Sequence, residues 1–143
     1  MRKIMPVLVG LLLLGIPIAR AAAPITKEQL QSMFDSMRRD APWKVDGPLL
    51  WGYYFTNATP EPLKQAAVQL EAMGYRVVDI SERPSAVSSA RWWLHVEKVE
   101  THSVESLHSR NQQLYELAKK WKLSSYDGMD VGPAPPKSSG ESR

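Results

Sequence analysis

The sequence predicts one α+β domain with a ferredoxin-like order of elements, preceded by one additional helix. Two helical stripes of apolar residues, over 60–73 and 104–121, alternate with short strand-like runs near positions 49, 76, 91 and 124. After the first helix, the order is strand, helix, strand, strand, helix, strand, which is that of the split βαβ fold. We therefore expect an antiparallel sheet with helices on one face, in which the first and third strands are central neighbours.

The chain begins with the three parts of a secretory signal peptide. A basic start precedes the apolar stretch Ile4–Ala19, and Ala19-Arg20-Ala21 forms a small-residue exit. The apolar stretch holds about 16 residues, whereas roughly 20 are needed to cross a bilayer. We expect the signal peptide to span 1–21, with cleavage after Ala21 or, alternatively, after Ala23. The product is then exported to the periplasm, without stable insertion into the membrane.

The basic character of the chain comes from this leader. The sequence has 18 basic and 15 acidic residues, and Arg2, Lys3 and Arg20 precede the cleavage position, which leaves 15 of each sign. A mature chain without net charge lacks the positive potential that favours phosphate binding. We therefore do not expect nucleic acid as a partner. Because the chain has no Cys, core burial rather than disulfides must stabilise it.

The mature chain opens with a predicted helix and strand. Thr26 and Gln29 have the spacing of a capping box, which predicts a helix over 26–39. The apolar face of this helix comprises Leu30, Met33, Phe34 and Met37. Two prolines and a glycine within 40–48 end the helix and lead into a strand over 49–55.

A second helix and strand follow. Thr59 is expected to cap the helix, with Pro60 in its first turn, and Gly74 ends it. The run 76–80 is strand-like, and the polar segment 81–89 predicts a loop.

The third strand has the clearest pattern, because apolar and polar side chains alternate over 91–99. Its predicted core-facing residues are Trp92, Leu94 and Val96, and those pointing the other way are Trp93, His95 and Glu97. A helix over 103–121 and a strand over 124–131 complete the domain, which spans 26–131. The Pro-, Ser- and Gly-rich tail 132–143 is expected to be disordered.

Several features of the domain are shared with a known family. They are the strand ending in Tyr54-Phe55, the helix running into Gly74-Tyr75, the Trp-containing third strand, and Tyr126-Asp127-Gly128 after the last helix. With these features, 50–133 resembles the ribonuclease E inhibitor RraB family. The resemblance implies a ferredoxin-like fold and a protein-binding modulator rather than a catalyst. Met129 stands where family members usually have Trp, and the leader directs the chain away from cytoplasmic ribonuclease E, so the target stays open.

His95 and Glu97 lie two positions apart on a strand and so project from one face, where they could share a metal or a proton. Structural zinc normally takes four protein ligands, and His102 and His108 are not placed to supply the others. The chain also lacks Cys and a Gly-x-Ser-x-Gly elbow. We therefore expect no metal, no cofactor and no catalysis. A small hydrolase or metal-assisted enzyme centred on His95 and Glu97 is the alternative.

The aromatic residues of the central strands suggest a binding surface. Tyr54 and Trp93 occupy positions that RNA-recognition sheets use to stack bases, but charge and compartment favour a protein or peptide. For Trp93, a core position and an exposed one are both open, and Tyr126-Asp127-Gly128 is either a β-bulge or a partner-contacting edge. The candidate partner-binding residues are Tyr54, Trp93, His95, Glu97, Tyr126, Asp127 and Gly128. The predicted function is that of a noncatalytic periplasmic protein-binding or regulatory module.

Overall fold

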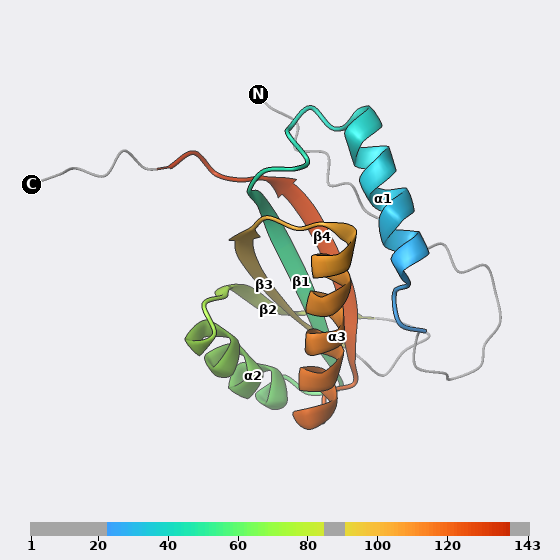
Figure 1. Cartoon of the computed structure of the whole chain (residues 1–143). Coiled ribbons are helices and arrows are strands. Elements are labelled where there is room, and N and C mark those ends of the chain that lie inside the picture. Colours follow the sequence, from blue (N-terminus) through green and yellow to red (C-terminus); the bar gives the residue numbers. More distant parts are fainter. Residues whose placement is uncertain (1–22, 85–90, 138–143) are drawn as a thin grey trace, which may run out of the picture.

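The computed structural model describes residues 23–84 and 91–137, which form a four-stranded antiparallel sheet and three helices (Figure 1). The helices are α1 (Lys27–Asp40), α2 (Glu61–Ala72) and α3 (Val104–Lys120), and the strands are β1 (Leu49–Asn57), β2 (Arg76–Glu82), β3 (Trp92–Glu100) and β4 (Ser125–Pro133). The strand order is β2-β3-β1-β4. This order confirms the ferredoxin-like arrangement and the central pairing of the first and third strands.

The predicted leader over 1–21 and its favoured cleavage position lie outside the described residues. The same holds for 85–90 of the predicted loop and for 138–143 of the predicted tail. Across the described ranges, none of the helices has the length and apolarity that a membrane crossing requires.

Strand β1 supplies the centre of the core. Trp51, Tyr53 and Phe55 alternate along it and are fully buried, because they point toward the helices. In the register with β3, Tyr53 lies opposite Val96 and Phe55 opposite Leu94. Both β3 residues are fully buried as well. The alternation predicted for the third strand is therefore confirmed.

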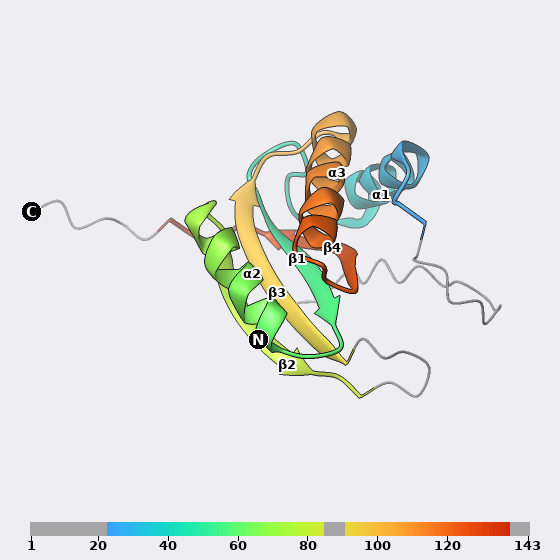
Figure 2. The same cartoon turned by 90° about the horizontal axis from the view of Figure 1, so that it is seen from below.

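Helix α1 begins at the predicted capping box. The Thr26 side chain accepts from the Gln29 amide at 3.2 Å, and the Gln29 side chain accepts from the Thr26 amide at 2.9 Å. The predicted apolar face is buried, and its Phe34 ring lies 6.1 Å from the ring of Trp51. Figure 2 shows α2 and α3 over the sheet, with α1 beside α3.

Helix α2 begins one residue later than predicted. Its N-cap is Pro60, which makes no side-chain capping bond. The predicted Thr59 cap is therefore wrong, and the carbonyl oxygen and hydroxyl of Thr59 instead accept from Asn57 Nδ2 at 3.1 Å and 3.4 Å. Gly74 follows the helix with a φ of 92°, which confirms it as the terminating residue.

Strands β1, β2 and β4 are longer than the sequence predicted. In β4, Gly132 pairs with Leu50 and Pro133 with Leu49, so these two residues belong to the sheet rather than to the tail. In β2, Ser81 and Glu82 pair with β3 and are not part of the loop. In each case a partner strand supplies backbone groups opposite residues whose own composition is typical of loops.

Candidate functional site

The face of the sheet turned away from the helices, here called the open face, carries a cluster of three rings. Tyr54 pairs with His95 in the β1–β3 register, and their rings stack at 4.4 Å with an interplanar angle of 14°. The Trp93 ring meets that of Tyr54 edge to face at 6.2 Å. All three residues are half-buried. Trp93 therefore belongs to the open face, whereas its neighbour Trp92 packs against the core.

The aromatic cluster, defined as Tyr54, Trp93 and His95, is fixed from the β4 side. The Tyr54 hydroxyl donates to Asp130 Oδ2 at 2.6 Å. Burial, together with this hydrogen bond and the charge of Asp130, raises the pKa of Tyr54. Asp130 pairs with Gly52, whose missing side chain leaves room for the carboxylate and for the His95 ring. The cluster is thus a preorganised surface.

Arg83, just beyond the end of β2, lies over the cluster. Its guanidinium carbon is 4.8 Å from the centre of the Trp93 ring and 6.0 Å from that of Tyr54. These are cation–π distances. Within 23–84 and 91–137, Arg83 takes part in none of the ion pairs.

His95 and Glu97 share the open face, as the alternation predicted, but they do not form a pair. Glu97 is buried and its carboxylate is ion-paired with Arg76. The His95 Nε2 atom is buried without a hydrogen-bond partner in the described part of the chain. Burial lowers the pKa of His95, although the charges of Asp130 and Asp79 oppose this effect. Among the described residues, no group of three or more potential ligands is arranged to hold a metal ion.

The Tyr126-Asp127-Gly128 segment forms a β-bulge. Tyr54 lies opposite Gly128 and Phe55 opposite Tyr126, so Asp127 is the extra residue, and Gly128 has a φ of 104°. Asp127 is exposed. Tyr126 is 5% exposed and donates from its hydroxyl to Asn111 Oδ1 at 2.7 Å. Its prediction as a partner-contacting side chain is therefore wrong, because the bulge returns it to the core face.

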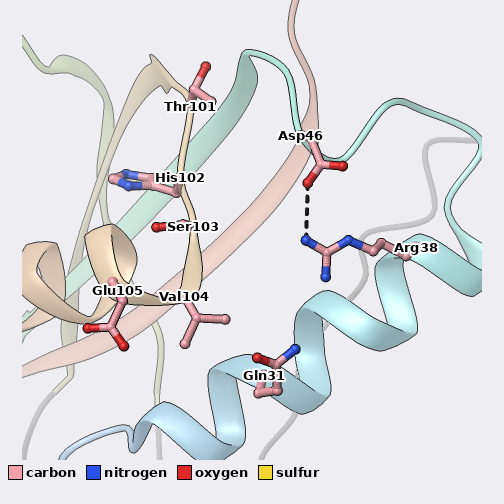
Figure 3. A pocket seen from close by; sticks show the side chains of 8 residues that line it. All are labelled: Gln31, Arg38, Asp46, Thr101, His102, Ser103, Val104 and Glu105. Carbon is pink, nitrogen blue, oxygen red and sulfur yellow. Dashed lines mark hydrogen bonds and ion pairs between the residues drawn. The ribbon is translucent and has the colours of Figure 1, made fainter.

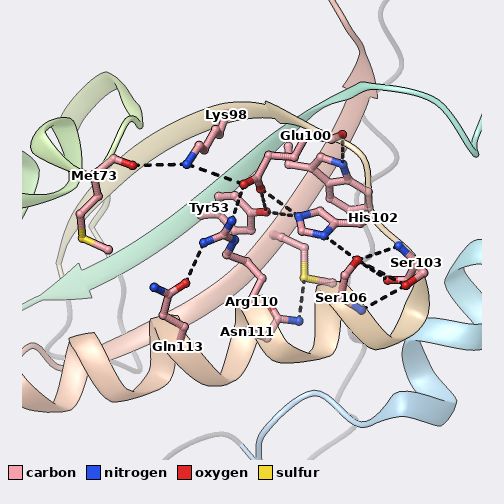
Figure 4. A network of polar contacts seen from close by, with 12 residues as sticks. Tyr53, Met73, Lys98, Glu100, His102, Ser103, Ser106, Arg110, Asn111 and Gln113 are labelled. Atoms are coloured by element: carbon pink, nitrogen blue, oxygen red, sulfur yellow. Dashed lines mark hydrogen bonds and ion pairs between the residues drawn. The ribbon is translucent and has the colours of Figure 1, made fainter.

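Sequence reasoning missed a buried polar network beneath the helices, centred on Glu100 (Figure 4). The Glu100 carboxylate accepts from the Tyr53 hydroxyl at 2.9 Å, from His102 Nε2 at 2.9 Å and from Arg110 Nη2 at 2.5 Å. Burial alone would raise the pKa of Glu100, but these hydrogen bonds and the charge of Arg110 outweigh it and lower the pKa to about 2. The sequence held one indication of this network: Glu100 lies an even number of positions after Leu94 and Val96, so it faces the core as they do.

A pocket of about 490 Å³ lies between α1 and the connection from β3 to α3 (Figure 3). Two of its lining residues, Arg38 and Asp46, form an ion pair at 3.0 Å. A third, His102, is bound through Nδ1 to Ser106 and through Nε2 to Glu100. Because these three polar side chains already have hydrogen-bond or ion-pair partners, they are less free to bind a ligand in this pocket.

A protein-family model described as Regulator of ribonuclease activity B (RraB) matches residues 27–131. The match runs from the first residue of α1 to Val131 in β4, so it covers the helices and nearly the whole sheet. No curated protein matches the chain. By the extent of the family match, the chain belongs to the RraB family.

Proposed function

We propose that the chain is a noncatalytic, exported regulator that binds a protein partner through the open face of its sheet. The family to which it belongs is one of regulators of ribonuclease activity. The observation that carries the proposal is the aromatic cluster, which lies on the face opposite the helices with Arg83 above it. Export is supported by the predicted leader over 1–21.

The composition and rigidity of this surface favour protein binding. Trp, Tyr and Arg are the residues most enriched at binding hot spots, and the open face presents Trp93, Tyr54 and Arg83 side by side. Stacking on His95 and the hydrogen bond to Asp130 restrict Tyr54 before any partner arrives. A side chain that is already ordered loses less entropy on binding, which leaves more of the contact energy for affinity.

The same geometry disfavours RNA, even though the rings occupy the strand positions of RNA-recognition sheets. His95 stacks against one face of Tyr54 and so takes the place that a base would occupy. Two carboxylates on the strands of this face, those of Asp79 and Asp130, belong to none of the ion pairs of the described residues and would face the phosphates. A protein partner meets neither obstacle.

The proposal is tested by placing a photoreactive amino acid at position 93 of the full-length chain, expressed in its native host. The matched control carries it at position 68 on α2, where Val68 is 63% exposed on the helical side of the molecule. We expect irradiation to yield a discrete adduct in the periplasmic fraction from position 93 and not from position 68. Equal adducts from both positions, or none from position 93, would contradict binding through the open face.

Export has its own measurement. We expect the intact mass of the periplasmic protein to start at Ala22, or at Pro24 if cleavage follows Ala23. A full-length chain retained in the cytoplasm or the inner membrane would contradict export while leaving the crosslinking result intact. Adding the purified protein to a ribonuclease E cleavage assay then shows whether the activity implied by the family has been kept.

A further inference from the structure

We propose that the open face receives a basic side chain, arginine or lysine, from the protein partner. This inference rests on the proposed function, because it specifies the chemistry of the partner at that surface. It is carried by the carboxylates that flank the aromatic cluster and by a cation that the rings already hold.

Carboxylates flank the cluster from both sides. Asp79 of β2 lies opposite His95, and Asp130 of β4 lies opposite Gly52 and accepts from Tyr54. Asp127 is exposed at the neighbouring bulge. Within the described ranges, none of these three carboxylates belongs to an ion pair.

The cations of this face do not balance those carboxylates. Arg76 is neutralised by its ion pair with Glu97. Arg83 is the cation in contact with the rings, and exposed Arg91 lies beside it, with its carbonyl oxygen accepting from the Arg83 amide. These two cations stand against three unpaired carboxylates, those of Asp79, Asp127 and Asp130. The excess of negative charge attracts basic groups and repels acidic ones, so it favours a partner with a basic contact residue.

The rings themselves are suited to a cation. Trp93 and Tyr54 already hold the guanidinium of Arg83 at cation–π distance. A partner arginine or lysine placed here is attracted by the ring faces and by the carboxylates. An acidic residue would be repelled by the carboxylates, and an apolar residue would gain nothing from their charge. Arg83 would compete with that residue for the same ring faces.

This competition can be tested, because it predicts in which direction the binding affinity changes for a basic probe and for an acidic one. The probes are two fluorescein-labelled decapeptides, one alternating arginine and serine, the other alternating glutamate and serine, titrated into the purified protein at low salt. We expect the arginine peptide to bind more tightly, with an affinity that falls as salt is added. Asp79→Asn and Asp130→Asn should each weaken it about two- to fivefold, the range for single exposed ion pairs.

The control Glu71→Gln removes the same charge from an exposed position on α2 and should leave the affinity unchanged. Arg83→Gln should strengthen binding of the arginine peptide, because it removes the competing cation. Circular dichroism of each variant verifies that it is folded.

Tighter binding of the glutamate peptide, or weaker binding of the arginine peptide by Arg83→Gln, would overturn the basic-partner inference. So would a preference for short single-stranded RNA over the arginine peptide. None of these outcomes changes the result expected from crosslinking at position 93, so the basic-partner inference can fail while the proposed function holds. Loss of the position 93 adduct would instead remove the proposed function itself.

Discussion

Replacing Gly52 with Ala tests how closely the open face is packed. Gly52 lies on β1 opposite Asp130, and a Cβ added there would overlap Asp130 Oδ1 and approach His95 Nε2 to 2.8 Å. No conformational strain of the backbone is involved, because the φ of Gly52 is not in the left-handed region. The cost of Gly52→Ala therefore measures the displacement of its neighbours.

The magnitude follows from the bond that must break. To clear the new methyl group, Asp130 must turn away and give up the 2.6 Å hydrogen bond from Tyr54. A hydrogen bond to a charged group is worth about 1.5–3 kcal/mol. Alanine in place of glycine inside a strand returns about 0.5–1 kcal/mol by lowering the entropy of the unfolded chain. We expect Gly52→Ala to lower the free energy of unfolding by about 1–2 kcal/mol, measured by urea denaturation.

The chain offers a matched control on the neighbouring strand. A Cβ added at Gly132 of β4 meets nothing within 4 Å, so Gly132→Ala should be neutral or slightly stabilising. In an Asp130→Ala background the penalty of Gly52→Ala should largely disappear. If Gly52→Ala matches Gly132→Ala in stability, or if Asp130→Ala brings no relief, the packing of Asp130 and His95 over Gly52 is wrong.

The remaining predictions concern the core. Leu94→Ala deletes a fully buried side chain and should lower the free energy of unfolding, measured by urea denaturation, by about 2–5 kcal/mol. Trp93→Ala on the open face should lower it by about 1 kcal/mol. Equal losses would place Trp93 in the core. The folded-state pKa of Glu100 lies below its ordinary value of 4.5, at about 2, so its stabilisation is present above pH 4.5 and is lost as the pH falls toward 2. Urea denaturation between pH 7 and pH 2 should show that the free energy of unfolding falls by on the order of 1–3 kcal/mol. The Glu100→Gln variant should be less stable at pH 7, and its free energy of unfolding should depend less on pH. The same pH dependence in both proteins would contradict the network. Tyr126→Phe leaves the buried Asn111 without its 2.7 Å hydrogen bond and should cost about 1–3 kcal/mol, while a neutral result would place the Tyr126 side chain at the surface.

The sequence predicted those elements whose side chains repeat with one period. Alternation on β3 and the apolar face of α1 were read correctly, because each residue follows from its neighbours in the chain. The ends of the strands were not predicted correctly, because Ser81 and Gly132 are strand residues only through the residues they pair with on neighbouring strands. The capping box at Thr26 was predicted because it is local. The predicted Thr59 cap was wrong, because the helix begins one residue later and the Thr59 hydroxyl contacts Asn57 instead.

The candidate site was predictable only in part, for a related reason. Residues two apart on one strand, such as Trp93 and His95, can be assigned to one face from spacing alone. The contribution of Asp130 depends on the β1–β4 register, which the bulge at Asp127 shifts by one residue. That shift also explains why Tyr126, a candidate partner-binding residue, faces the core instead. The Asp-Gly pair predicted a β-bulge as one of two interpretations, but no sequence period carries the insertion, so the shifted register became visible only in the paired strands.

The bulge also decides what the departure from the family pattern means for binding. Met129, which stands where RraB proteins usually have Trp, pairs with Tyr53 on the core face and packs against the core. Asn111 Nδ2 lies 3.5 Å from its sulfur. A flexible thioether fills irregular space in a core more readily than an indole does. Met129 therefore lies beneath α3, on the opposite side of the sheet from Trp93 and Arg83, so this departure from the family pattern falls on the core face and not on the proposed binding surface.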